Sequence, residues 1–387
     1  MRIAVPKERQ AGETRVALTP DVVQRLTKQG HEIVVESGAG ASAGAPDSAY
    51  TDAGARIAPD AASAQAGADL VVRVNPPSAA EIADVPQGAL LTSFLFPATH
   101  ADEVRAARER GIGWFAMDLV PRITRAQAMD ALSSMSTVAG YRAALLAAWH
   151  LGRFFPMLMT AAGTIPPSRV VVCGVGVAGL QAIATCRRLG AIVEAYDVRA
   201  EAREQARSLG AESIEVDLGE AGEGSGGYAR ELSPDALRKL EAALAERVKK
   251  ADAVITTALI PGRPAPRLVD AETVAAMRPG AVVVDLAAEA GGNVAGTVAG
   301  EVVNVGGVTL VGTLNLPATM ALDASRMYAR NIQDVVRHLT PAKPAEGEAA
   351  PAPVHIDLDD EITTGALAVY GGEVRHAPTR EALGAAS

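Results

Sequence analysis

Short apolar runs alternate with amphipathic stretches along about the first 120 residues of the chain. Uninterrupted apolar runs of this length are typical of strands that a parallel sheet buries on both faces. The predicted strands are RIAVP, HEIVVE, DLVVRV, ALLTSF and IGWFAM. Between the first two lies TPDVVQRLTKQG, where Thr19 precedes a helical pattern, Pro20 opens it and Gly30 follows it. This alternation predicts a parallel sheet with helical crossovers.

A second strand and helix series begins after Pro166 and Pro167. Its predicted strands are RVVVC, AIVEAYD, SIEVD, ADAVITTA, GAVVVDLA and VTLVGTL. Long helical patterns, one from about 127 to 159 and one around SRMYARNIQDVVRHL, precede and follow this series. We therefore expect an α/β protein with two Rossmann-like domains, each with a parallel sheet, joined by long helices with a cleft between them.

The expected domain boundaries follow these helices. Residues 1–136 together with about 322–387 are expected to form the first domain, and residues 137–321 the second. Residues 341–353 are rich in proline, alanine and glutamate, which is typical of a flexible linker, here within the C-terminal part.

Composition narrows the function classes. Only 3% of the residues are aromatic, so the cores must consist of Val, Ile, Leu and Ala. The net charge of −9 argues against binding to nucleic acid. Cys173 and Cys186 form no C-x-x-C pair and are expected to be reduced, buried thiols. Neither the N-terminus nor the uncharged run at 302–322 has the pattern of a signal peptide or membrane span, and no metal site is predicted.

The most informative motif follows the first strand of the second series. Gly174, Gly176 and Gly179 form G-x-G-x-x-G between an apolar run and a helical pattern. In dinucleotide-binding folds the first glycine allows a tight turn and the second lets the backbone approach a pyrophosphate. The third lets helix and strand pack closely, and the phosphates lie at the helix N-terminus. The other residues of the turn are Val175, Val177 and Ala178.

An acidic residue, Asp197, ends the next predicted strand, 18 residues after Gly179. A carboxylate at this place accepts hydrogen bonds from the adenosine ribose and repels a 2′-phosphate, which favours NAD(H) over NADP(H). Arg199, just after Val198, is a residue type that accommodates a 2′-phosphate, but Asp197 holds the position at the strand end. The alternative is a Rossmann-like domain with an empty loop.

Four polar residues, Arg122, Gln127, Asp130 and Ser133, cluster before and within the first long helical pattern. The last three are three residues apart, which places them on one stripe of a helix. Thr124 and Gln127 also fit a capping box, so spacing alone leaves helix capping and ligand binding open. On the functional interpretation, the stripe orients a nicotinamide for hydride transfer, a reaction that requires positioning more than an acid or base.

These residues carry a resemblance to a known family. RITRAQAMDALSSMSTVAGYRAAL resembles the signature of the NAD(H)-binding component, domain I of the alpha subunit, of proton-translocating NAD(P) transhydrogenase. The similarity continues through CGVGVAGLQAIATCRRLGAIVEAYDVR, GGYA, ITTALIPGRPAP and VVDLAAEAGGN, and covers nearly the whole chain.

The resemblance implies a role for each motif. Arg122, Gln127, Asp130 and Ser133 would contact the nicotinamide and serve as catalytic positioning residues. The glycine turn and the segment from Asp197 to Arg199 would hold the rest of the NAD(H). Gly227 and Tyr228 match a mobile loop that closes on the nucleotide, and Leu259 would line the adenine or ribose side.

The closest rival is alanine dehydrogenase, which the N-terminal half also resembles. That chemistry needs a lysine to polarise the carbonyl and a histidine as acid and base. This chain has Asn75 and Phe96 at the corresponding places, and the remaining Arg15 could only bind a carboxylate. A non-catalytic NAD-sensing module is a further alternative, although a sensor that reads only the adenosine half would not need the nicotinamide-facing residues.

The resemblance implies direct hydride transfer from NADH to NADP⁺. NADP(H) would be held only on a partner, the NADP(H)-binding domain III subunit, and a membrane proton-channel subunit would couple the reaction to proton translocation. The chain is expected to be a stand-alone subunit and a homodimer. It would be cytoplasmic and peripheral at the inner face of the membrane through its partner subunits.

Overall fold

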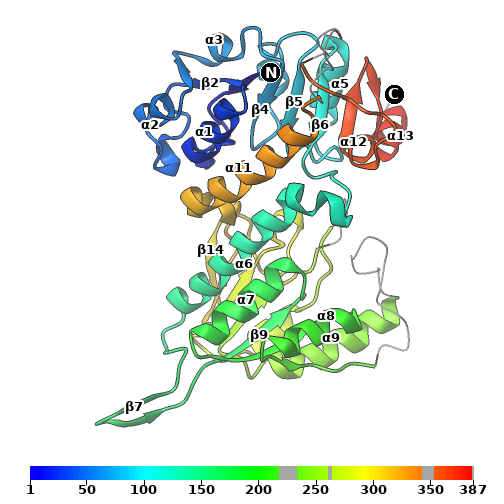
Figure 1. Ribbon diagram of the computed structural model, residues 1–387. Helices are drawn as coiled ribbons and strands as arrows, with labels where there is room; N and C mark the ends of the chain where they lie inside the picture. The colour runs from blue at the N-terminus through cyan, green and yellow to red at the C-terminus, as the bar shows by residue number, and fades with distance from the viewer. Residues whose placement is uncertain (218–232, 260–263, 342–352, 386–387) are drawn as a thin grey trace. The chain divides into compact units, whose positions relative to one another are not determined.

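The computed structural model describes residues 1–217, 233–259, 264–341 and 353–385. The chain divides into two compact units, each built around its own sheet (Figure 1). Unit 1 comprises Met1–Met135 and Ala318–Ser387, and unit 2 comprises Ser136–Pro317. The predicted fold class, α/β with two mainly parallel sheets, is confirmed.

Unit 1 contains an eight-stranded sheet of order β17-β16-β6-β5-β4-β1-β2-β3. Its parallel strands are β1 (Arg2–Val5), β2 (Glu32–Glu36), β3 (Arg56–Ala58), β4 (Leu70–Val72), β5 (Leu90–Ser93) and β6 (Gly113–Ala116). The C-terminal segment adds β16 (Leu367–Tyr370), antiparallel to β6, and β17 (Glu373–Val374), antiparallel to β16. Because the first six strands are parallel, the residues that follow them all lie at one edge of the sheet.

The helices of unit 1 cover the sheet. They are α1 (Pro20–Lys28), η1 (Ala41–Ala43), α2 (Asp47–Asp52), α3 (Ala61–Gln65), α4 (Ala79–Ile82), α5 (Ala101–Arg110), η2 (Thr124–Met129), α11 (Ala321–His338), α12 (Glu361–Ala366) and α13 (Ala377–Ala385). Helix α11 is the second long helix expected from the sequence. It buries one apolar stripe, including Tyr328, Ile332 and Val335, and packs against α1 and η2.

Unit 2 contains a seven-stranded sheet of order β11-β10-β9-β12-β13-β15-β14. The strands are β9 (Arg169–Cys173), β10 (Ile192–Tyr196), β11 (Glu212–Ser213), β12 (Ala253–Thr256), β13 (Val282–Asp285), β14 (Val302–Val305) and β15 (Val308–Val311), and only β14 is antiparallel to its neighbour. Its helices are α6 (Ala131–His150), which begins in unit 1, α7 (Val177–Arg188), α8 (Ala200–Ser208), α9 (Pro234–Val248) and α10 (Ala271–Ala275), with the short turns η4 (Ala288–Ala290) and η5 (Leu316–Met320). The strand order reverses at β9, and ligands of open parallel sheets bind at such a point.

The prediction of one helix from about 127 to 159 is wrong at both ends. Residues Thr124–Met129 form a 3-10 turn, and α6 begins only at Ala131 because Asp130 leaves the helical conformation. After His150 the chain forms a hairpin of β7 (Leu158–Thr160) and β8 (Gly163–Ile165) that projects from unit 2 (Figure 1). Isolated two-stranded hairpins are only marginally stable, so this one needs a further contact.

Candidate functional site

The glycine turn of unit 2 lies at the carboxyl end of β9. Gly174 has φ +93, which a side chain would disfavour, and its N–H donates to the Tyr196 carbonyl over 2.8 Å. A Cβ at Gly179 would lie 1.9 Å from the Gly174 carbonyl oxygen, so α7 packs on the turn only with glycine there. A Cβ at Gly176 would meet no atom within 4 Å. The first and third glycines therefore have structural reasons, while the second leaves open space at the N-terminus of α7.

Asp197 is buried directly after β10 and faces the turn. Its Oδ2 accepts the Val175 N–H over 2.7 Å, and the Arg199 guanidinium donates to both carboxylate oxygens over 2.9 Å. Burial alone would raise the pKa of Asp197, but the hydrogen bonds from Arg199 and Val175 outweigh it and hold the pKa below its usual range. The carboxylate is thus ionised and can accept further hydrogen bonds.

A second loop at the same edge is fixed by side chains that the sequence analysis did not assign to the site. Thr257 donates its hydroxyl to the Gly174 carbonyl over 2.9 Å. The buried Asn293 amide donates to the Ala258 carbonyl and accepts the Ala258 N–H, over 2.9 and 3.1 Å. These bonds hold Leu259, which is 46% exposed, on the segment beside the glycine turn.

Asp285 supports this arrangement from the end of β13. Its carboxylate accepts the Thr256 hydroxyl over 3.0 Å and the backbone N–H groups of Ala287 and Val294. The motif GGN at 291–293 was the available signal in the sequence, since a buried asparagine after two glycines indicates a side chain that replaces missing backbone bonds.

The polar residues of unit 1 are arranged differently from the expected helical stripe. Asp130 caps α6: it accepts the Ser133 N–H over 2.8 Å and the Ser133 hydroxyl over 2.5 Å. Gln127 lies in the 3-10 turn and is exposed, as is Arg122. The capping role expected for Thr124 is wrong, because the turn begins after Ile123 without a side-chain cap.

A buried charged network occupies the edge of unit 1 where strands β1 and β4 end. Glu13 binds Arg15 through two hydrogen bonds of 2.7 and 2.6 Å and accepts the Asn75 amide over 2.7 Å. Burial acts to raise the pKa of Glu13, but Arg15 and Asn75 dominate and lower it to about 2. Asn75, at the position of the lysine required by alanine dehydrogenase, is therefore a neutral partner of a glutamate.

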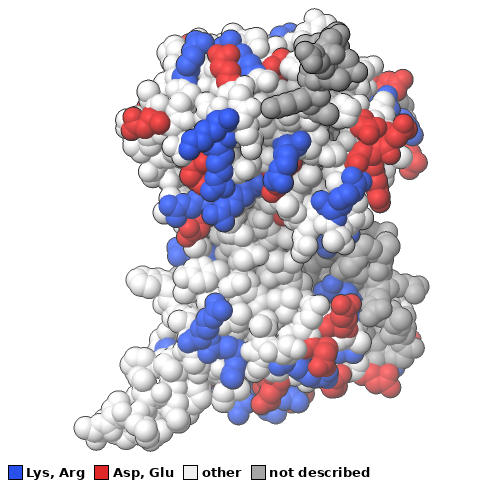
Figure 2. All heavy atoms as spheres, viewed as in Figure 1, with Lys and Arg blue, Asp and Glu red and all other residues white. Residues whose placement is uncertain are grey.

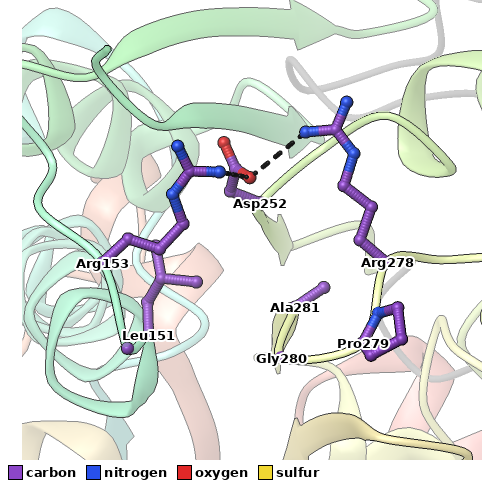
Figure 3. Close-up of a pocket in the computed structure, with 8 residues that line it drawn as sticks. Leu151, Arg153, Asp252, Arg278, Pro279, Gly280 and Ala281 are labelled. Carbon is purple, nitrogen blue, oxygen red and sulfur yellow. Dashed lines mark hydrogen bonds and ion pairs between the residues drawn. The ribbon is translucent and has the colours of Figure 1, made fainter. Parts of the chain in front are cut away.

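Another charged group of unit 2 has a structural explanation. Leu151, Gly152, Arg153, Asp252, Arg278, Pro279, Gly280 and Ala281 line a cavity of about 230 Å³ (Figure 3). Asp252, buried just before β12, accepts hydrogen bonds from Arg153 over 2.6 Å and Arg278 over 3.4 Å. This position is the amino end of the sheet, opposite the glycine turn, so the arginines neutralise a buried carboxylate away from the dinucleotide edge.

Comparisons with known proteins identify the family. The models for the N-terminal and C-terminal domains of alanine dehydrogenase/PNT match residues 4–139 and 143–377. In Rhodospirillum rubrum, the first of the polypeptides that make up the NAD(P) transhydrogenase alpha subunit is 46% identical over 383 residues, covering 97% of this chain and 98% of that protein. The chain belongs to the family of NAD(P) transhydrogenase alpha subunits.

Two further comparisons place this family member among its relatives. The crystal structure of transhydrogenase from Sinorhizobium meliloti has a TM-score of 0.83 and 42% identity, covering 98% of this chain and 100% of that one. Alanine dehydrogenase of Mycobacterium tuberculosis is 35% identical over 295 residues, 76% of this chain and 74% of that protein. The family predicted from the sequence is thus confirmed, and the rival is a more distant relative.

The structure of this transhydrogenase family member groups the predicted site residues by unit. The glycine turn, with Val175, Val177 and Ala178, lies beside Asp197, Val198 and Arg199 in unit 2, while Arg122, Gln127, Asp130 and Ser133 lie in unit 1. Gly227 and Tyr228, and most of the predicted linker at 341–353, lie outside the described residues. Among the described residues, no helix is both long and apolar enough to cross a membrane.

Proposed function

We propose that the chain binds NAD(H) and that hydride passes directly from NADH to NADP⁺ held on a partner subunit. The observation that supports this most strongly is the glycine turn, which leaves space at Gly176 and has an ionised Asp197 beside it. The relatives named NAD(P) transhydrogenase subunit alpha favour the same reaction.

In this proposal the residues of unit 2 hold the adenosine half. The N–H groups at the start of α7 bind the pyrophosphate, and Asp197 accepts hydrogen bonds from the ribose. Arg199 is already engaged by the Asp197 carboxylate, so it offers little to a 2′-phosphate, and the preference is for NAD(H). Leu259 contacts the adenine or ribose, and Tyr228 closes over the nucleotide.

Residues of unit 1 orient the nicotinamide of the same dinucleotide. Exposed Arg122 and Gln127 supply donors and an acceptor for the carboxamide and ribose. Asp130 and Ser133 fix the start of α6 through their mutual hydrogen bonds and present oxygens to the ring. These residues position the ring without a proton transfer, and the nicotinamide itself supplies the hydride chemistry.

The partners in this proposal are a second copy of the chain, an NADP(H)-binding subunit and a membrane proton-channel subunit. Through them the chain would lie at the cytoplasmic face of a membrane and couple hydride transfer to proton translocation. The hairpin supports the homodimer: Met159 and nearby Trp149 are 82% and 83% exposed, and residues 154–168 contain no charged side chain. Figure 2 shows this hairpin as an uncharged projection from unit 2.

The test is an assay of hydride transfer between nucleotides by the purified chain with and without its NADP(H)-binding partner. We expect transfer only in the mixture, and replacement of Gln127 by Asn should lower its rate about 10-fold or more because the amide no longer reaches its hydrogen-bonding partner. An unchanged rate would reduce Gln127 to a structural role. Oxidation of alanine or reduction of pyruvate by the chain alone would instead establish the dehydrogenase alternative.

A further inference from the structure

Phe96 has an unusual backbone at an exposed position. It follows β5 in unit 1 and has φ +49; among the described residues, Asn315 is the only other non-glycine residue with positive φ. Bulky residues adopt this conformation only when the surroundings impose it, and such strain concentrates at ligand sites. Yet the side chain is 43% exposed, so burial does not account for the conformation.

The strained turn is held from both sides. The Asp118 carboxylate, which follows β6, accepts the N–H groups of Leu95 and Phe96 over 2.6 and 2.9 Å. The Phe96 ring stacks on Phe94 with centroids 5.5 Å apart and planes at 20°, and Phe94 contacts the ring of Tyr328 at 5.4 Å. Tyr328 is fixed in turn because its hydroxyl donates to the Arg73 carbonyl. The result is a rigid aromatic row with one end exposed.

The row lies at the edge of the sheet that carries the polar residues of unit 1. Strands β5 and β6 are parallel, and their carboxyl ends lead to Phe96 and, through Asp118, to Arg122. Helix α11, which carries Tyr328, also carries Asn331, whose amide donates to the Ala128 carbonyl beside Gln127 over 2.8 Å. One helix therefore connects the aromatic row to the 3-10 turn that bears Gln127.

We propose that Phe96 is a contact residue for the nicotinamide ring, which stacks on the exposed part of its side chain while Arg122 and Gln127 bind the carboxamide and ribose. This inference rests on the proposed function. A planar, electron-poor ring suits an offset aromatic stack, and a rigid support restrains the ring without adding a proton donor. The strained turn keeps the phenyl group available at the surface instead of letting it collapse into the core.

The experiment compares the affinities of NADH and ADP-ribose, which lacks the nicotinamide, for the full chain and its variants. Phe96→Gly removes the ring and relieves the positive φ, so the thermal midpoint should not fall. We expect it to weaken NADH binding about 3- to 10-fold and leave ADP-ribose binding unchanged. Phe96→Trp should restore the NADH affinity, and Phe154→Ala, at another exposed phenylalanine, serves as the matched control.

Two results would overturn the inference in distinguishable ways. If wild type binds NADH but the Gly variant binds NADH and ADP-ribose as wild type does, or loses both affinities equally, Phe96 does not contact the nicotinamide. If wild type fails to bind NADH at all, the proposed function fails first and takes this inference with it.

Discussion

Buried charges in unit 1 are tied to specific partners at the level of single residues. Glu13 is completely buried beside Arg15, and Arg73 pairs with Glu81 over 2.7 Å. A buried ion pair adds little net stability over an apolar pair, but loss of one partner leaves an uncompensated charge. Glu13 and Arg15 are therefore expected to be sensitive positions although neither is assigned a role with the nucleotide.

The pH dependence of stability should reveal Glu13. Its folded-state pKa of about 2 is below the usual 4.5, so its contribution is complete above pH 4.5 and is lost as the pH falls toward 2. The full contribution corresponds to roughly 3 kcal/mol. In Glu13→Gln, unit 1 should unfold at lower urea concentration near neutral pH, and this difference from wild type should shrink toward pH 2. Fluorescence of the buried Trp114 in a Trp149→Phe background reports on unit 1.

Exposed Glu109 provides the control, because Glu109→Gln removes one acidic group without breaking a buried pair. A constant difference between wild type and Glu13→Gln from neutral pH to pH 2 would contradict the assigned pairing.

At the level of elements, the glycine turn separates structural from ligand-binding constraints. Gly179→Ala should destabilise unit 2 by about 2–4 kcal/mol, because the added Cβ would lie 1.9 Å from the Gly174 carbonyl. Gly176→Ala has open space and φ −79, so it should fold normally but bind NADH at least about 10-fold more weakly, since its methyl group meets the pyrophosphate. Thermal unfolding and NADH titration of both variants measure the two effects, and unaltered NADH affinity in Gly176→Ala would place the pyrophosphate elsewhere.

The strands were more predictable than the long helix. RVVVC and GAVVVDLA are continuous apolar runs ended by glycine or aspartate, and each forms a central strand where predicted. The helix from 127 to 159 was wrong because hydrophobic periodicity does not register a cap inside a helical pattern. Asp130 ends the 3-10 turn and starts α6, and Leu158 and Met159, which favour helices by propensity, form a hairpin strand instead.

The candidate site was predictable in its motifs and less so in its supports. Glycine spacing located the turn and the acid at the end of the next strand because both follow from local geometry. Asn293 and Phe96 act through contacts with segments distant in sequence or through a backbone conformation, and neither property is visible in a single sequence. The same limit explains why Arg199 was ambiguous until its bonds to Asp197 were known.

At the level of the whole molecule, the proposed homodimer predicts a role for the hairpin. Met159→Glu places a charge on the exposed apolar strand, so the dimer dissociation constant should rise about 100-fold or more. Leu358→Glu, at an exposed leucine of unit 1, is the matched control and should leave the dimer intact. Sedimentation equilibrium measures both, and an unchanged dimer in Met159→Glu would remove the hairpin from the interface.

Direct hydride transfer is tested most directly with NADH that carries deuterium at C4 on the transferred face. The chain, its NADP(H)-binding partner, labelled NADH and NADP⁺ are mixed in ordinary water, and the NADPH formed is analysed by mass spectrometry and NMR. We predict that the NADPH carries the deuterium at C4 with no hydrogen from solvent, and that the chain alone forms none. NADPH that contains solvent hydrogen at C4, or label transfer without the partner, would contradict the proposed function.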